Sequence, residues 1–263
     1  MPRWRVTGPL LIVAALAPRL AAATYSPPLT EVRIDRDRLL HTPAVVYASD
    51  RRTTSATDLK LNGLGVQYIA QLEWDFGFGV QAGGSAGYAR VAGDVGRLAL
   101  GGVHVDTRGY WLGGQLRAYQ MLYKSEVSEG ERPSAITAFV NIRTLYYNVS
   151  GSTSDGEASL RFLTVTGGLG AMAEFSISDY VSICPYAWLT PGLTSKLDYS
   201  VRDRDFDADI GFTFRNPFLF GIDVWIYLFP PNWDDHLSLS VLASLVDTDG
   251  DDKTIATVIG YTF

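Results

Sequence analysis

Five long stretches of the sequence alternate between apolar residues and small or polar ones. They are 59–74, 76–90, 134–148, 160–175 and 212–228. Successive side chains of a β-strand point to opposite faces, so each stretch has one apolar face and one face rich in Gly, Ser, Thr and Gln. The stretches run for about 10 to 16 residues, whereas soluble strands usually have about 5 or 6. The chain is therefore predicted to be all-β, with unusually long strands.

The composition of the polar faces indicates which side of each strand meets which environment. These faces carry little Lys or Glu, although a soluble sheet turns a charged side to open water. A crowded, partly wet interior with the apolar faces in lipid explains the pattern better. The 26 Gly, 12 Phe, 14 Tyr and 6 Trp residues of the 263-residue chain agree with this. Small barrels need Gly where strands curve, and aromatic girdles at both membrane interfaces.

The N-terminus has the layout of a secretory signal peptide. Arg3 and Arg5 form a positive region, 10–17 is an apolar core, and the small residues 21–23 offer a cleavage site. The core is too short to span a bilayer, which needs about 20 residues. We expect a signal peptide over 1–23, a periplasmic N-terminal extension over 24–42, and a barrel over 43–263.

The last strand-like stretch carries a second signal of export. Ile255, Thr257, Ile259, Tyr261 and Phe263 alternate up to a terminal aromatic residue. This pattern resembles the C-terminal β-signal of bacterial outer-membrane β-barrel proteins. The resemblance implies that the barrel-assembly machinery recognises Ile259, Tyr261 and Phe263. The resemblance implies a transmembrane antiparallel up-and-down β-barrel in the outer membrane of a Gram-negative bacterium.

The strand count follows from the turns, because the chain end of such barrels is periplasmic and the outer loops are the longer ones. Less regular strands are expected at 43–49, 108–123, 180–192, 236–246 and 253–263, which gives ten in all. Eight or twelve strands remain open. The stretch 108–123 is ambiguous, because Gln120 falls on the face of Leu116 and Ala118.

Two predicted outer loops, 193–209 and 247–252, are rich in aspartate. The candidate cation ligands in them are Asp205, Asp207, Asp209, Asp247, Asp249 and Asp251. Carboxylates at this spacing can bind a hard cation such as calcium, but the pattern lacks the Gly and Glu placement of an EF-hand. A solvated acidic loop is the favoured interpretation. No metal site and no cofactor is expected, and the three His residues lie far apart in sequence.

The segment from Asp234 to Ser238 invites an enzymatic interpretation. Omptin proteases and lipid A deacylases are outer-membrane barrels that use His with Asp, or His with Ser and Glu, and the resemblance here is of residue types alone. The predicted topology places His236 at the periplasmic end, whereas those families act near the outer face. A turn followed by a polar strand start is favoured.

Five charged residues fall on the small, polar faces and are predicted to line the interior: Glu73, Arg117, Arg143, Glu174 and Asp223. Unpaired charges in a narrow interior are costly, so they are expected to pair with one another or to border water. We predict a charge cluster that closes the periplasmic half of the barrel.

Three functions compete, in this order: a non-enzymatic barrel with a filled or narrow lumen and interacting surface loops, a narrow porin-like channel for small solutes, and an outer-membrane hydrolase. Wide aqueous channels appear near 16 strands, which disfavours the second. The expected partners are outer-membrane lipid and lipopolysaccharide, with the protein itself a monomer. The net charge of −6 argues against a nucleic-acid partner.

Export predicts cleavage after Ala23, because the small residues 21–23 follow the apolar core. Mass spectrometry of the N-terminus of the envelope-localised protein measures this. A mature protein that begins at Met1 would exclude a cleaved signal peptide.

Overall fold

The computed structural model describes residues 38–53, 57–74, 77–95, 103–126, 133–153, 156–189, 192–201, 204–210, 218–229, 232–244 and 253–263. The expected signal peptide and most of the N-terminal extension lie outside them. None of the described residues forms a helix long and apolar enough to cross a membrane.

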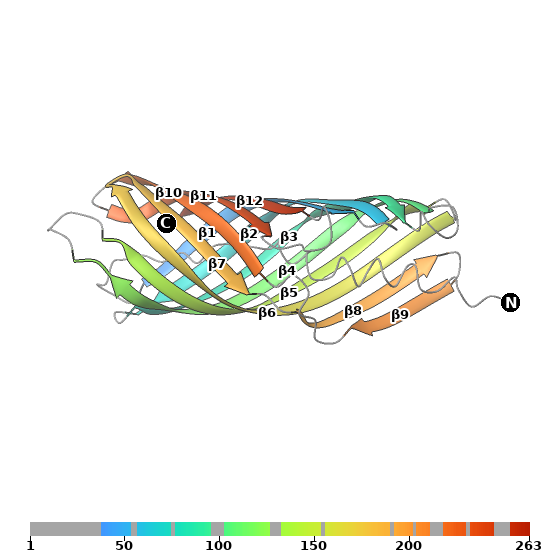
Figure 1. Cartoon of the computed structure of the whole chain (residues 1–263), viewed down its shortest axis with the longest axis horizontal. Helices are drawn as coiled ribbons and strands as arrows, with labels where there is room; N and C mark the ends of the chain where they lie inside the picture. The colour runs from blue at the N-terminus through green and yellow to red at the C-terminus, as the bar shows by residue number, and fades with distance from the viewer. Residues whose placement is uncertain are drawn as a thin grey trace.

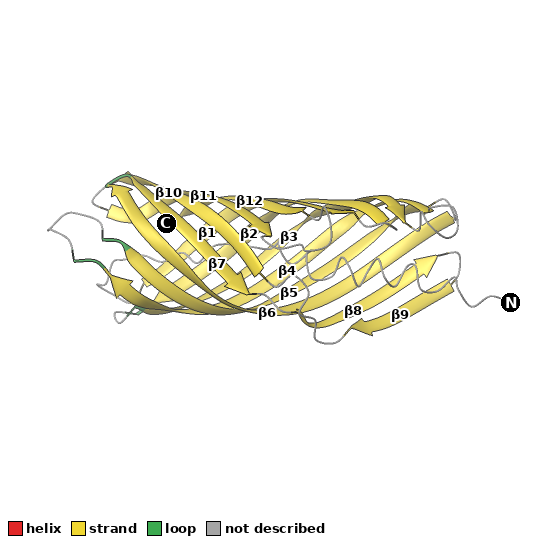
Figure 2. Ribbon diagram, viewed as in Figure 1, coloured by secondary structure: helices red, strands yellow, loops and turns green. Residues whose placement is uncertain are grey.

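The described residues form twelve antiparallel strands (Figures 1 and 2). In chain order these are β1 (Arg38–Thr53), β2 (Thr57–Glu73), β3 (Phe78–Val95), β4 (Val103–Lys124), β5 (Ala135–Thr153), β6 (Gly156–Ser178), β7 (Val181–Leu189), β8 (Gly192–Val201), β9 (Arg204–Ile210), β10 (Phe218–Phe229), β11 (Asn232–Ser244) and β12 (Lys253–Thr262).

Ten of these strands close into a barrel, as the strand pattern predicts. The order around the wall is β5-β4-β3-β2-β1-β12-β11-β10-β7-β6, and the pairing of β5 with β6 completes the ring. The two remaining strands, β8 and β9, form a hairpin that extends the wall beside the outer half of β6. The open alternatives of eight or twelve strands in the ring are thereby excluded.

The pairing register sets the tilt and width of the barrel. Tyr186 on β7 pairs with Met172 on β6. Followed in the other direction around the ring, from each residue to its paired neighbour, the path from Tyr186 returns to β6 at Leu160. The path runs through Gly221, Leu242, Ala256, Ala48, Gly63, Ala89, Gly109 and Val149. Ten strands with this twelve-residue offset imply a strand tilt of about 40° and a radius of about 10 Å.

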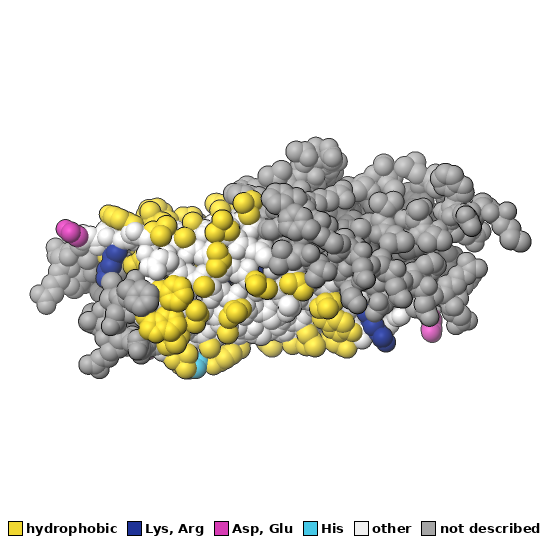
Figure 3. Space-filling view, turned by 90° about the horizontal axis from the view of Figure 1, so that it is seen from below, with side chains coloured by type: hydrophobic (Ala, Val, Ile, Leu, Met, Phe, Trp, Pro, Cys, Tyr) yellow, Lys and Arg dark blue, Asp and Glu magenta, His cyan; other side chains and the backbone are white. Residues whose placement is uncertain are grey.

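Apolar side chains cover the outside of the barrel. Leu64, Val66, Leu116, Val140 and Leu169 are each about half exposed or more, and they belong to the apolar faces predicted from the alternation. Figure 3 shows such side chains as a broad band with charged residues beyond both of its ends. The band fits a hydrocarbon layer, because exposure of this much apolar surface to water would be strongly unfavourable.

Aromatic residues mark the two borders of the band. On β3, Phe78 stacks on Trp74 at the periplasmic turn, and Tyr88 lies ten residues farther along on the same face, half exposed. Ten residues of a strand tilted by 40° rise about 25 Å, which is the height of the apolar band of an outer-membrane barrel. In the same outer girdle, Tyr110 on β4 is directly opposite Tyr88, and Tyr47 on β1 is separated from Tyr88 by Leu64 of β2. Both tyrosines are about as exposed as Tyr88.

The wall is much taller on one side than on the other. Strands β3 to β6 continue about 15 to 20 Å beyond the outer girdle, whereas β7, β10 and β11 end close to its level. The hairpin β8–β9 joins the tall side, and Figure 1 shows it projecting beyond the short strands.

Two local features differ from the sequence-based prediction, and a third resolves the ambiguity of 108–123. β1 begins at Arg38 rather than at residue 43, so the end of the expected extension is already strand. The predicted outer loop 193–209 contains the hairpin, because β6 outlasts β7 and its exposed edge takes β8 as a partner. Finally, a bulge between Met121 and Tyr123 ends the regular alternation of β4, and Gln120 lies before it on the outward face.

The C-terminal strand closes the barrel against the first strand. β12 pairs with β1 and β11 along eight residues each. Beyond these ladders, the backbones of Phe263 and His41 exchange two hydrogen bonds of 3.0 and 3.1 Å. The Phe263 ring lies on the His41 ring at 5.7 Å, at the periplasmic border.

Substitution Phe263→Asp, or deletion of Phe263, is expected to impair insertion, because the final strand must pair before the sheet edge can enter lipid. The measurement is the amount of heat-modifiable protein in the outer membrane. Phe229→Asp is the control, since Phe229 is an exposed aromatic residue at the same end of β10. Equal insertion of Phe263→Asp and the wild type would refute the assembly-signal interpretation of 259–263.

Candidate functional site

The interior of the barrel gathers the charged residues that the sequence analysis selected. Glu73, Arg117, Arg143, Glu174 and Asp223 are all buried, and they come from β2, β4, β5, β6 and β10. Each lies on the face opposite the lipid-exposed residues of its strand, because faces alternate along a strand. The arrangement around these charges is therefore the candidate site.

The layer nearest the periplasm combines two glutamates with two tyrosines. The Tyr119 hydroxyl donates a 2.9 Å hydrogen bond to Glu73 Oε2, and the Tyr227 hydroxyl donates one of 3.4 Å to Glu174 Oε1. Glu73 on β2 and Glu174 on β6 are close enough for their charges to repel each other, while the charge of Lys124 attracts Glu73. Phenol donors thus solvate both carboxylates where bulk water is excluded.

The layer above contains Arg117 and two glutamines. Arg117 Nη1 donates to Gln81 Oε1 at 2.9 Å, and Gln81 Nε2 donates to Gln71 Oε1 at 2.6 Å. The Arg117 guanidinium also lies 4.7 Å from the centre of the Phe139 ring. These three polar side chains form a connected chain across β4, β3 and β2, and an aromatic face supports the cation.

Asp223 lies at similar depth on the other side of the barrel. It is fully buried, and its Oδ2 accepts a 2.8 Å hydrogen bond from Trp225 Nε1, two residues along the same face of β10. An indole N–H can donate a hydrogen bond but not accept one, so it suits a buried carboxylate that has lost its hydrogen bonds to water.

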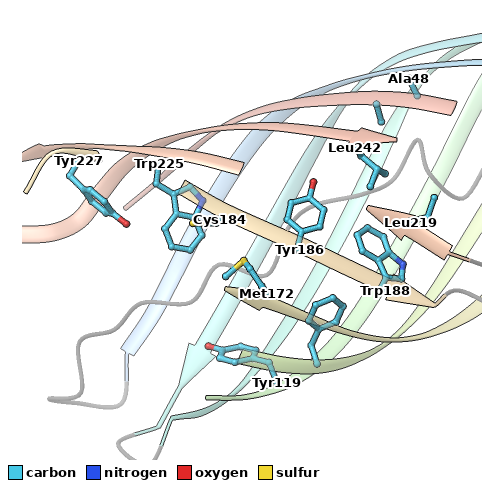
Figure 4. Packing of buried hydrophobic residues seen from close by; sticks show 12 residues of the cluster. Ala48, Tyr119, Met172, Cys184, Tyr186, Trp188, Leu219, Trp225, Tyr227 and Leu242 are labelled. Atoms are coloured by element: carbon cyan, nitrogen blue, oxygen red, sulfur yellow. The ribbon is translucent and has the colours of Figure 1, made fainter. Parts of the chain in front are cut away.

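Higher in the barrel, aromatic rings dominate. The Arg143 guanidinium lies 5.5 Å from the centre of the Trp188 ring. Trp188 in turn packs edge-on against Phe139 and beside Tyr186, with ring centres 6.2 and 5.7 Å apart. The Tyr186 and Ser240 hydroxyls are 2.7 Å apart and hydrogen-bonded. Figure 4 shows this cluster of buried residues pointing from the strands into the barrel.

The aromatic partners are the part that sequence reasoning missed. The prediction named guanidinium groups as partners of the carboxylates and did not anticipate the hydrogen bonds that Tyr119, Tyr227 and Trp225 donate to Glu73, Glu174 and Asp223. A signal was present in the sequence, because these large aromatic residues stand on faces otherwise made of small and polar residues. Whether the cluster closes the barrel remains a proposal.

The predicted position of His236 agrees with the structure, which pairs it with Thr262 at the periplasmic end of β11. His236 is buried between Trp225 and Tyr227, with ring centres 5.2 and 5.3 Å away. Asp235 instead accepts a hydrogen bond from Tyr261 on the adjoining strand. Consecutive residues of a strand point to opposite faces, so Asp235 does not orient the His236 ring as an Asp–His dyad requires.

The aspartate-rich candidates cannot be placed in the site. Asp247, Asp249 and Asp251 lie outside the described residues. Residues 205, 207 and 209 lie on β9, whose backbone alone is described. Within the described part of the chain, no three His, Cys, Asp or Glu side chains are arranged to hold a metal ion.

Comparison with known proteins adds solved structures of similar architecture. No protein-family model and no curated protein matches the chain. The translocator domain of the autotransporter NalP from Neisseria meningitidis matches over 97% of this chain and 94% of its own, at 10% identity and a TM-score of 0.43. The outer membrane protease OmpT from Escherichia coli matches over 89% of this chain and 98% of its own, at 9% identity and a TM-score of 0.46. Ail from Yersinia pestis matches over 85% of this chain and 98% of its own, at 16% identity and a TM-score of 0.34. Such distant matches assign no activity.

The closed ten-strand ring, the outward apolar band and the two aromatic borders define this chain as an outer-membrane β-barrel protein. The structure leaves its subfamily undefined.

Tyr119→Phe is expected to destabilise the barrel by about 1 to 3 kcal/mol, because it leaves a buried Glu73 oxygen without its donor. Tyr123→Phe is the matched control, since Tyr123 is on the same strand but exposed on the outward face. Unfolding by urea in detergent, followed by Trp fluorescence, gives both values. Equal stability of the two variants would show that the Tyr119 hydroxyl does not solvate Glu73.

Proposed function

We propose that this protein is a non-enzymatic outer-membrane barrel whose membrane-embedded interior is closed by side chains. Its function would then lie in the outward extension of the wall, which presents a surface to the surroundings of the cell. The burial of large residues on the inward faces carries this proposal.

Nine large side chains on the inward faces are each less than 2% exposed: Trp111, Trp188, Trp225, Arg117, Arg143, Tyr147, Tyr186, Tyr227 and Phe139. An eight-stranded barrel is just wide enough for ordinary side chains to fill it. A ten-stranded one is wider, and side chains of this size fill the added space. A conducting channel would instead need a continuous row of water-exposed polar groups.

A large cluster of buried apolar residues extends around most of the wall. Its members come from β1, β4, β5, β6, β7, β10, β11 and β12: Ala48, Tyr119, Phe139, Met172, Cys184, Tyr186, Trp188, Leu219, Trp225, Tyr227, Leu242 and Ala256. Packing of this extent makes the interior a core, and cores have little space for a water path.

The tall side of the wall supports the second half of the proposal. Strands that pass the girdle by 15 to 20 Å are longer than membrane spanning needs, since about 9 to 11 tilted residues suffice. The added length of β4, β5 and β6, at 22, 19 and 23 residues, builds a projecting sheet. A projecting sheet offers a firm base for contact with partners outside the cell.

Single-channel recording in a planar bilayer tests the closed interior. The refolded wild type is expected to give no stable unitary conductance. Arg117→Ala is expected to lower the melting temperature and to add a measurable leak. The substitution leaves the neighbouring buried polar groups without their partner, at a cost of about 3 to 5 kcal/mol. Arg161→Ala is the control, since Arg161 is exposed on the outside of β6. Steady conductance by the wild type would favour the channel function instead.

A further inference from the structure

A belt of basic residues lies immediately outside the outer aromatic girdle. On β3, Arg90 is two residues beyond Tyr88, and on β4, Arg108 is two residues beyond Tyr110. Two residues of a strand tilted by 40° correspond to about 5 Å of height, which places both guanidinium-bearing positions at the level of the lipid headgroups. Both side chains are about half exposed, at 46% and 59%.

The register brings further cations to the same belt. Arg90 and Arg108 are directly opposite each other. Lys60 of β2, which is exposed, is directly opposite Arg51 of β1, and Arg51 is directly opposite Lys253 of β12. Residues opposite one another in an antiparallel pair share a face, so the positions of Arg51 and Lys253 are on the same face of the sheet as the exposed Lys60.

Direct opposition of like charges destabilises a sheet unless an anion lies between them. Among the side chains that the structure describes, Asp106 lies between these two cations: it forms a 2.9 Å ion pair with Arg90 and lies 3.8 Å from Arg108. The hydrogen bonds from Arg90 hold the pKa of the Asp106 carboxyl below its usual range. One carboxylate does not balance the two guanidinium groups that it contacts.

The order of charges along the barrel axis indicates on which side of the cations a further anion can bind. From the membrane outward come the tyrosines, then the cations, and then the acidic positions Asp58, Asp94 and Asp106. Asp58 and Asp94 are opposite each other in the register. Lys60, Arg90 and Arg108 therefore have acidic positions on their outer side, and the girdle tyrosines and the membrane surface on their inner side.

We propose that the belt formed by Lys60, Arg90 and Arg108, with the positions of Arg51 and Lys253, binds phosphate groups of outer-leaflet lipid such as lipopolysaccharide. Arg presents forked donors that match phosphate oxygens, and Lys adds a point charge. The tyrosines beneath bury their rings in the upper acyl region with their hydroxyls at the headgroups. The belt thus fixes a layer of lipid against the β12–β1–β2–β3–β4 side of the barrel, independently of whether the interior is closed.

Titration of the refolded, detergent-solubilised full chain with lipopolysaccharide tests the proposal, with melting temperature and native mass spectrometry as readouts. The wild type is expected to gain stability and to retain bound lipid. Each cation near an anionic surface contributes roughly fivefold to affinity, so K60Q/R90Q/R108Q is expected to bind on the order of 100-fold more weakly. The R90K/R108K variant keeps the charges and is expected to retain most of the binding.

A one-for-one comparison on β4 controls for general loss of charge. Arg108→Gln is expected to weaken binding about fivefold, whereas Lys124→Gln, at the opposite end of the strand, leaves it unchanged. Heat-modifiable mobility first establishes that each variant is folded. Equal binding by wild type and triple variant would overturn the proposal. The proposal would also be overturned if the wild type bound chemically dephosphorylated lipid as well as intact lipopolysaccharide. The same holds if inorganic phosphate alone, at the same concentration, stabilised the wild type as much as lipopolysaccharide does.

Discussion

Backbone hydrogen bonding in lipid is the constraint on which this structure depends. Every amide and carbonyl group inside the hydrocarbon layer must find its partner in the protein, and an open sheet edge there is very costly. The pairing of β12 with β1 and of β5 with β6 removes both edges at once. Closure then fixes the offset of twelve residues, and the offset fixes the tilt, the radius and the height of the apolar band.

The same closure determines how the interior can be built. A radius of about 10 Å leaves more room than small side chains occupy, and the inward faces contain many glycines. Large aromatic residues occupy that room, and several glycines make space for them. A Cβ at Gly87 would lie 2.6 Å from the Trp111 ring, and one at Gly221 would lie 2.2 Å from Tyr186. The buried charges are tolerated because phenol, indole and amide groups replace the water they lose.

The fold was predictable from the sequence because lipid exposure imposes a period-two pattern on every strand. The outward faces of 59–74, 134–148 and 160–175 agree residue by residue with the exposed side chains, and the five lumen charges are all buried as expected. The β8–β9 hairpin could not be found in this way. It lies above the membrane, where no lipid face enforces alternation, and the length of β6 creates the need for it.

The partners of the interior charges were likewise beyond prediction. Which donors reach Glu73 and Glu174 depends on the relative height of residues on different strands, and this follows from the offset around the ring. The alternation within one strand carries no information about that offset. Trp225 and Tyr227 stood out only as aromatic residues on a polar face. Tyr119 on β4 reaches Glu73 on β2 across β3 because both residues are opposite Gly79 in the register.

Site-directed spin labelling on β5 tests most directly that one face meets lipid and the other a closed interior. Single cysteines at Ile136, Thr137, Val140 and Asn141, in a Cys184→Ser background, would carry nitroxides in the reconstituted protein. The outward positions 136 and 140 should be accessible to dissolved oxygen, which partitions into lipid. The inward positions 137 and 141 should be shielded both from oxygen and from a water-soluble nickel chelate. Strong access of the chelate to 137 and 141 would contradict a closed interior, and loss of the alternation in oxygen access would contradict the barrel register itself.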